Sequence, residues 1–103
     1  MGWQVIIAPS ARADLAEIVR FVARHDSESA ARLGYELITG AEKLAAFPEI
    51  GRVVPEFQRP ELREVICRSY RIIYRITHAN QSLEVVRFWH GARGFPHIPG
   101  RGC

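Results

Sequence analysis

Four side chains in the second half of the chain could do chemistry together: Arg68, Arg71, His90 and Arg93. A guanidinium can grip a phosphate with two parallel hydrogen bonds, which suits arginine to stabilising negative charge. Arginine is a poor base, so His90 is the member of this set that could move a proton near neutral pH. The set predicts an anion-binding site, whereas cleavage of a phosphodiester would also need an acid and a base in position.

The charged residues are unevenly distributed along the chain. The 103 residues include 14 Lys+Arg and 11 Asp+Glu, a formal net charge of +3, and Lys43 is the only lysine. Residues 1–50 hold five basic and seven acidic residues, a net charge of −2, whereas residues 51–103 hold nine and four, a net charge of +5. An arginine-rich half favours an anionic partner: phosphate, nucleic acid or an acidic protein. A genome rich in G and C would also favour arginine over lysine, but it explains the asymmetry less well.

The composition indicates one globular domain. At 48% hydrophobic and 24% charged residues, the chain can bury a single core, and its length leaves no room for a second domain. No apolar run approaches the roughly 20 residues of a membrane helix, and no secretory signal is present, so we expect a cytoplasmic protein without a membrane partner. Two cysteines, Cys67 and Cys103, make no disulfide framework. Without metal-ligand spacing or a glycine-rich phosphate loop, we expect no metal and no cofactor.

The first half of the chain predicts one strand and two helices. The segment Trp3–Ala8 is short, apolar and β-branched, and Pro9 stops it, which indicates a strand. Ser10 is the expected N-cap of the first helix, and Asp26 or Ser27 that of the second. Apolar residues then recur at helical spacing, first at Leu15, Ile18, Val19 and Val22, and later at Leu33, Leu37, Ile38 and Leu44. The short link between the helices predicts an antiparallel helical hairpin.

Three strand-like runs follow a connection rich in proline and glycine: Leu62–Cys67, Tyr70–Thr77 and Leu83–His90. The short links between them predict antiparallel hairpins. The order is therefore β-α-α-β-β-β, an α+β fold in which the helical hairpin covers one face of a small, mostly antiparallel sheet. We expect the other face to be partly open and to carry Arg71 and Arg75.

Each candidate residue also has a purely structural interpretation. Arg71 and Arg75 can be strand residues that pair with Glu64 or Glu84 across the sheet. His90 and Arg93 can end the last strand by bonding backbone carbonyls. Trp89 can be a packing residue, although an exposed tryptophan could also anchor a protein partner.

Four stretches of this sequence resemble the RelE/ParE superfamily of bacterial type II toxins. They are Pro9–Ile18, which opens the first helix, Leu44–Arg52, the "L…P..G" helix exit, Arg68–Ile76, the "YRI.Y.I" strand, and Val86–Arg93, the "HG.R" ending. Each motif is weak alone, but four in order cover about residues 3–95. The resemblance implies a single toxin domain over residues 1–95 with an irregular tail at 96–103. The "HG.R" ending is closer to the ParE, or plasmid stabilisation, branch.

The two branches imply different activities. ParE-like toxins act on DNA gyrase and block replication, whereas RelE-like toxins cut messenger RNA in the ribosomal A site. Both are neutralised by a cognate antitoxin, through which the complex commonly binds its operator DNA. A third possibility is a relic that binds antitoxin but is no longer toxic.

The site residues differ between these readings. If the chain is a metal-independent endoribonuclease, Arg71, His90 and Arg93 are the expected catalytic residues. The tail lacks the tyrosine of RelE-like enzymes, and the lysines ahead of their sheet are missing, which favours a non-catalytic toxin aimed at gyrase. In that case the expected target- or antitoxin-binding residues are Arg63, Arg68, Arg71, Arg75, Trp89 and Arg93.

Overall fold

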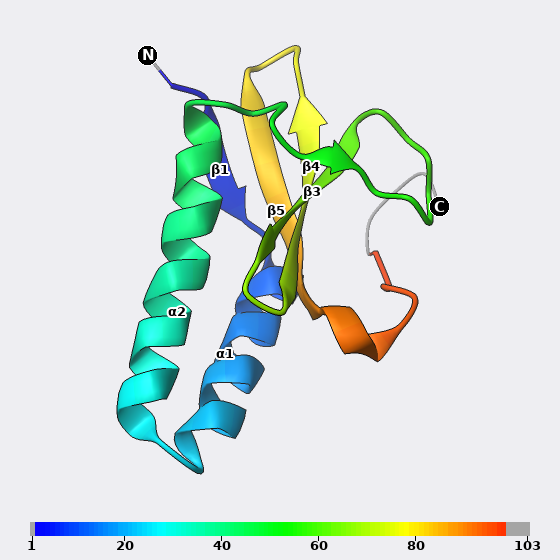
Figure 1. The fold of residues 1–103 in the computed structure, drawn as a ribbon. Coiled ribbons are helices and arrows are strands. Elements are labelled where there is room, and N and C mark those ends of the chain that lie inside the picture. Colours follow the sequence, from blue (N-terminus) through cyan, green and yellow to red (C-terminus); the bar gives the residue numbers. More distant parts are fainter. Residues whose placement is uncertain (1, 99–103) are drawn as a thin grey trace.

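A computed structural model describes residues 2–98, so Cys103 and the end of the predicted tail lie outside the described residues. Two helices lie against one face of a five-stranded sheet (Figure 1). The elements, in chain order, are β1 (Gln4–Ile7), α1 (Pro9–Ala23), α2 (Ser27–Glu42), the 3₁₀ turn η1 (Lys43–Ala45), β2 (Arg52–Val53), β3 (Leu62–Cys67), β4 (Tyr70–Thr77), β5 (Ser82–His90) and the 3₁₀ turn η2 (Gly91–Arg93).

The strand order across the sheet is β1-β5-β4-β3-β2. Strands β3, β4 and β5 form the predicted antiparallel meander, while β1 lies at the edge of the sheet and pairs parallel with β5. The short strand β2 adds one element to the predicted order and pairs with Arg63 and Glu64 of β3. A β-bulge interrupts the β4–β5 ladder, where Ile73 pairs with Arg87 and Tyr74 pairs with Val85. The α+β fold class is confirmed.

One of the two predicted helix caps is wrong. Helix α1 begins at Pro9, with Ala8 as its N-cap and no side-chain capping bond, because proline at the first helical position already has the required φ. The Ser10 hydroxyl instead donates to the carbonyl of Val86 at 2.6 Å and ties the helix to β5. Asp26 caps α2 as predicted, since its side chain accepts from the backbone N–H groups of Glu28 and Ser29.

The main core lies between the helices and the sheet. Leu37 and Ala41 of α2 pack there against Ile72 and Tyr74 of β4 and Phe88 of β5. All five are buried, which fixes the helix-facing side of each strand. Alternate residues of β4 and β5 must therefore point to the outer face of the sheet.

The outer face is covered only in part, since Ile66 of β3, which lies on it, is 59% exposed. A second cluster of buried residues lies on it, made of Val54, Leu62, Ile73, Val86 and Trp89. Phe57, from the loop between β2 and β3, and Ile98, from the tail, pack against this cluster. Part of this cover comes from the connection between β2 and β3, which has no periodicity from which its packing could be predicted.

Candidate functional site

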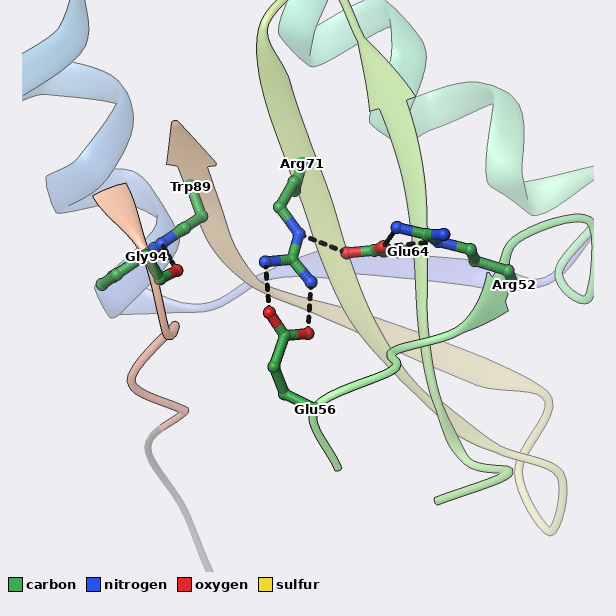
Figure 2. A network of polar contacts seen from close by, with 6 residues as sticks. All are labelled: Arg52, Glu56, Glu64, Arg71, Trp89 and Gly94. Carbon is green, nitrogen blue, oxygen red and sulfur yellow. Dashed lines mark hydrogen bonds and ion pairs between the residues drawn. The ribbon is translucent and has the colours of Figure 1, made fainter. Parts of the chain in front are cut away.

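Arg71 lies in a network of four charged side chains on the outer face of the sheet (Figure 2). Its Nε donates to Oε1 of Glu64 at 2.6 Å, while Nη1 and Nη2 donate to the two oxygens of Glu56 at 2.9 and 2.6 Å. The other oxygen of Glu64 accepts from Arg52, with Nε at 2.7 Å. We call Arg52, Glu56, Glu64 and Arg71 the outer-face network. The structural interpretation of Arg71, a cross-strand pair with Glu64, is confirmed.

Within this network, Arg71 and Glu56 keep each other charged. Hydrogen bonding to Glu56, together with the nearby Glu64, raises the pKa of Arg71 far above its usual range. The same hydrogen bond lowers the pKa of Glu56. The Arg71 side chain is 10% exposed, and that of Glu64 is 0% exposed. Arg71 can therefore hold an anion but cannot give up or take a proton during a reaction.

The other predicted arginines of β3, β4 and their hairpin contact acceptors of the same chain. Arg68 pairs with Glu36 of α2 through two hydrogen bonds, and its Nη2 donates at 3.0 Å. Arg75 lies 3.6 Å from Glu84, the second predicted cross-strand pair, which is also confirmed. Arg63 donates to backbone carbonyls, among them Pro60 at 2.7 Å and Gly51 at 3.1 Å.

His90, Trp89 and Arg93 meet where β5 ends. The N–H of Ala92 donates to Nδ1 of His90 at 3.1 Å, so the histidine caps η2. Because Nδ1 accepts, the ring carries its proton on Nε2 in this arrangement. Arg93 stacks on the Trp89 indole, with its guanidinium carbon 4.0 Å from the ring centroid, a cation–π contact. The indole Nε1 donates to the carbonyl of Gly94 at 3.1 Å.

The sheet register separates two of the three predicted catalytic residues, Arg71 and His90. Tyr70 pairs with His90 and Arg71 pairs with Trp89, so His90 lies on the helix face and Arg71 on the outer face. The rings of Tyr70 and His90 meet edge-on at 5.0 Å on the helix face, where burial raises the pKa of the Tyr70 phenol. His90 and Arg93 line the same cavity, whereas Arg71 lies on the opposite face of the sheet from His90.

A groove runs along the helix face beside His90. It consists of a cavity of about 560 Å³, which lies between α1 and the ends of β4 and β5, and an adjoining one of about 310 Å³ between the helices and the β3–β4 turn. Val22 and Tyr70 line both cavities. The apolar residues of this helix-face groove are Ile18, Phe21, Val22, Leu33 and Phe88, its cationic residues are Arg32, Arg68 and Arg93, and its acidic residues are Asp14 and Glu17. Such a groove fits an extended or helical segment with apolar and acidic side chains.

Sequence reasoning missed Asp14 as an organising residue. Its side chain is 6% exposed and accepts from Nε and Nη2 of Arg87 at 2.7 and 2.6 Å and from the Phe88 N–H at 3.1 Å. Asp14 falls three residues after Ala11 and four before Ile18, so its helical phase already put it on the buried side of α1. Glu56 was missed too, but its loop offers no comparable signal.

The described part of the chain offers little to a metal or a membrane. Among residues 2–98, no group of three His, Cys, Asp or Glu side chains could hold a metal ion. No helix in the same range has the length and apolar character needed to cross a bilayer.

The sequence matches a known family over most of its length. Residues 5–95 fit the family model described as the ParE toxin of the type II toxin–antitoxin system parDE. The chain is also 30% identical to Toxin RelE1 of Caulobacter vibrioides over 95 residues, which cover 88% of this chain and 96% of the relative.

Solved structures share the fold at low identity. A structure of the chromosomal ParDE system from P. aeruginosa matches with a TM-score of 0.70 and 16% identity, covering 85% of this chain and 95% of that one. The RelBE2 toxin–antitoxin complex from Mycobacterium tuberculosis matches with a TM-score of 0.67 and 18% identity, covering 87% of this chain and 99% of that one. A mutant of the E. coli toxin RelE in the free state matches with a TM-score of 0.63 and 13% identity, covering 91% of this chain and 88% of that one.

Proposed function

The chain belongs to the ParE toxin family of type II toxin–antitoxin systems, within the RelE/ParE superfamily, and on this premise we propose that it arrests growth by binding DNA gyrase. A cognate antitoxin neutralises it in the cytoplasm, and operator DNA is bound only through that antitoxin.

The separation of Arg71 and His90 onto opposite faces of the sheet carries the proposal of a protein target. Metal-independent RNA cleavage needs a base, an acid and a charge-stabilising group around one phosphate. Here Arg71 is held by two carboxylates on the outer face, while His90 uses Nδ1 to cap η2 on the helix face. This arrangement supports binding rather than phosphodiester cleavage.

The helix-face groove supports a bound antitoxin segment. Phe21 of α1 lines it and is 57% exposed, and three arginines are among its lining residues. An acidic, partly apolar segment would be steered by these charges and anchored by its apolar side chains. Phe21→Ala is therefore expected to weaken antitoxin binding, measured by calorimetry, at least 10-fold. Tyr35→Ala removes another exposed aromatic side chain of the hairpin, outside the groove lining, and should leave the affinity unchanged.

Two assays on the same protein test the gyrase proposal. The purified toxin should inhibit supercoiling by purified gyrase, and antitoxin should restore it, while RNA from cells expressing the toxin stays intact. Uninhibited supercoiling together with growth arrest would refute the gyrase target. Harmless expression would identify a relic that binds antitoxin only.

A ribosome-dependent endoribonuclease is the second candidate, favoured by one observation: His90 and Arg93 line the same cavity. It predicts cleavage of messenger RNA in the ribosomal A site, mapped by RNA sequencing. His90→Ala or Arg93→Ala should abolish that cleavage, and unchanged cutting in both variants would remove these residues from the site.

A further inference from the structure

We propose that the Arg71 guanidinium is a binding site for an acidic side chain of the toxin's protein target, and that Glu56 occupies this site in the free toxin as an internal competitor. This inference rests on the proposed function in one respect, namely that the target is a protein.

The Arg71 side chain is already arranged to receive a carboxylate. Its Nε is fixed by Glu64, which is buried and is itself held by Arg52. The remaining two nitrogens point together at the Glu56 carboxylate, with a separate hydrogen bond to each oxygen (Figure 2). This two-point geometry is the one in which arginine recognises carboxylates. A carboxylate from a partner could therefore take the place of Glu56 without any change in Arg71.

Glu56 is the replaceable member of the outer-face network. Its side chain is 25% exposed, whereas that of Glu64 is 0% exposed. Glu56 lies in the irregular loop between β2 and β3, close to Gln58, whose φ of 53° is unfavourable for a residue with a side chain. Phe57 anchors the loop against the outer-face cluster, so Glu56 can swing into water while its neighbour stays in place.

The surroundings of Arg71 fit a protein better than a nucleic acid. Ile66 pairs with Arg71 across the β3–β4 ladder, so both lie on the outer face, and Ile66 is 59% exposed. Phe95, which follows η2, is also exposed and meets Phe57 edge-on at 5.2 Å. A protein partner that presents an acidic side chain between apolar ones could pair with Arg71 and contact both Ile66 and Phe95. The +5 charge of this half would speed its approach.

Competition by Glu56 has a calculable consequence. The apparent affinity for a partner carboxylate is reduced by the fraction of molecules in which Arg71 is open. If Glu56 leaves Arg71 in about 1–10% of molecules, its removal should tighten binding about 10- to 100-fold. Shortening the side chain should act in the same direction, because an aspartate at position 56 keeps the charge but reaches less far.

The test measures binding of a fluorescein-labelled hexaglutamate peptide to the purified full-length toxin by fluorescence anisotropy. Glu56→Gln and Glu56→Asp should each tighten binding about 10-fold or more. Glu61→Gln is the matched control, since it removes the same charge from the end of the same loop and lies away from Arg71. Adding Arg71→Lys to Glu56→Gln should abolish the gain, because an ammonium keeps the charge but lacks the two-point geometry.

The outcomes separate this inference from the proposed function. Equal tightening in Glu56→Gln and Glu61→Gln would overturn the inference, since the effect would then be general electrostatics. No tightening in either the Gln or the Asp variant would overturn it as well, provided circular dichroism shows folded protein. A gain in peptide affinity without any gyrase inhibition would support the Arg71 site and refute gyrase as its target.

Discussion

Replacing Asp14 should destabilise the fold more than any other single loss of charge on α1. Its carboxylate accepts two hydrogen bonds from Arg87 and one from the Phe88 N–H, and it joins α1 to β5 beside the helix-face groove. Asp14→Ala would leave the buried backbone N–H of Phe88 without this acceptor. It would also leave the guanidinium of Arg87, whose side chain is 14% exposed, without its counter-charge.

The magnitude follows from these contacts. Removing one partner of a buried ion pair costs about 3–5 kcal/mol, and the residual exposure of Arg87 puts Asp14→Ala at the lower end, about 3 kcal/mol. For a domain of this length the entropy of unfolding is about 0.2 kcal/mol per kelvin, so the melting temperature should fall by about 15 °C. Asp14→Asn keeps an acceptor for Phe88 but loses the charge. It should therefore cost about half as much, roughly 1.5 kcal/mol.

Thermal and urea unfolding, followed by circular dichroism, would measure both variants. Glu17→Gln is the control, because Glu17 is exposed on the same helix and should change stability by less than about 0.5 kcal/mol. A double-mutant cycle with Arg87→Gln should give a coupling energy of at least about 1.5 kcal/mol. If Asp14→Ala melted within a few degrees of wild type, the Asp14–Arg87 contact would not hold α1 to the sheet and the reasoning would be wrong.

Two further predictions concern a buried hydroxyl and the acid stability of the fold. The Tyr74 hydroxyl donates to the carbonyl of Pro48 and accepts from the buried N–H of Gly51. Tyr74→Phe should therefore lower the free energy of unfolding by about 1–3 kcal/mol. Urea unfolding would show this as a lower midpoint at unchanged slope. Hydrogen bonding to Arg71 lowers the pKa of Glu56 in the folded protein. The ionised Glu56 carboxylate therefore stabilises the fold above the unfolded-state pKa of about 4.3, and this stabilisation is lost as the pH falls through the pKa of Glu56 in the folded protein. The urea midpoint should thus drop less between pH 5 and pH 3 in Glu56→Gln than in wild type, and equal drops would contradict this role.

The strands could be predicted from the sequence because local rules determine them. Leu62–Cys67 and Tyr70–Thr77 have the predicted bounds, and β5 begins one residue earlier than predicted, at Ser82. Alternating side chains mark the two faces, and the two-residue link fixes the register of the hairpin. That register also made Glu64 a natural partner for Arg71.

The rest of the site depends on contacts between segments that no local rule connects. Glu56 reaches Arg71 only because Phe57 packs on the outer face, and residues 54–61 show neither helical nor strand periodicity. The separation of His90 from Arg71 follows from the β4–β5 register, which a four-residue link with a bulge leaves open in the sequence. The roles of Arg71, His90 and Arg93 in target binding or catalysis stay predictions.

The opposite net charges of the two halves of the chain partly serve to join them in the fold. Arg68 reaches from the sheet to Glu36 of α2, and Arg87 reaches to Asp14 of α1, so the basic half neutralises acids of the helical half across their interface. On the outer face, Arg71 is held by carboxylates of its own half. A ligand that offers only negative charge must compete with these internal carboxylates, which already hold the Arg71 guanidinium through direct hydrogen bonds. Recognition at the outer face should therefore depend on shape and on apolar contacts more than on net charge. We expect target binding to weaken much less with added salt than it does in proteins that contact many phosphates.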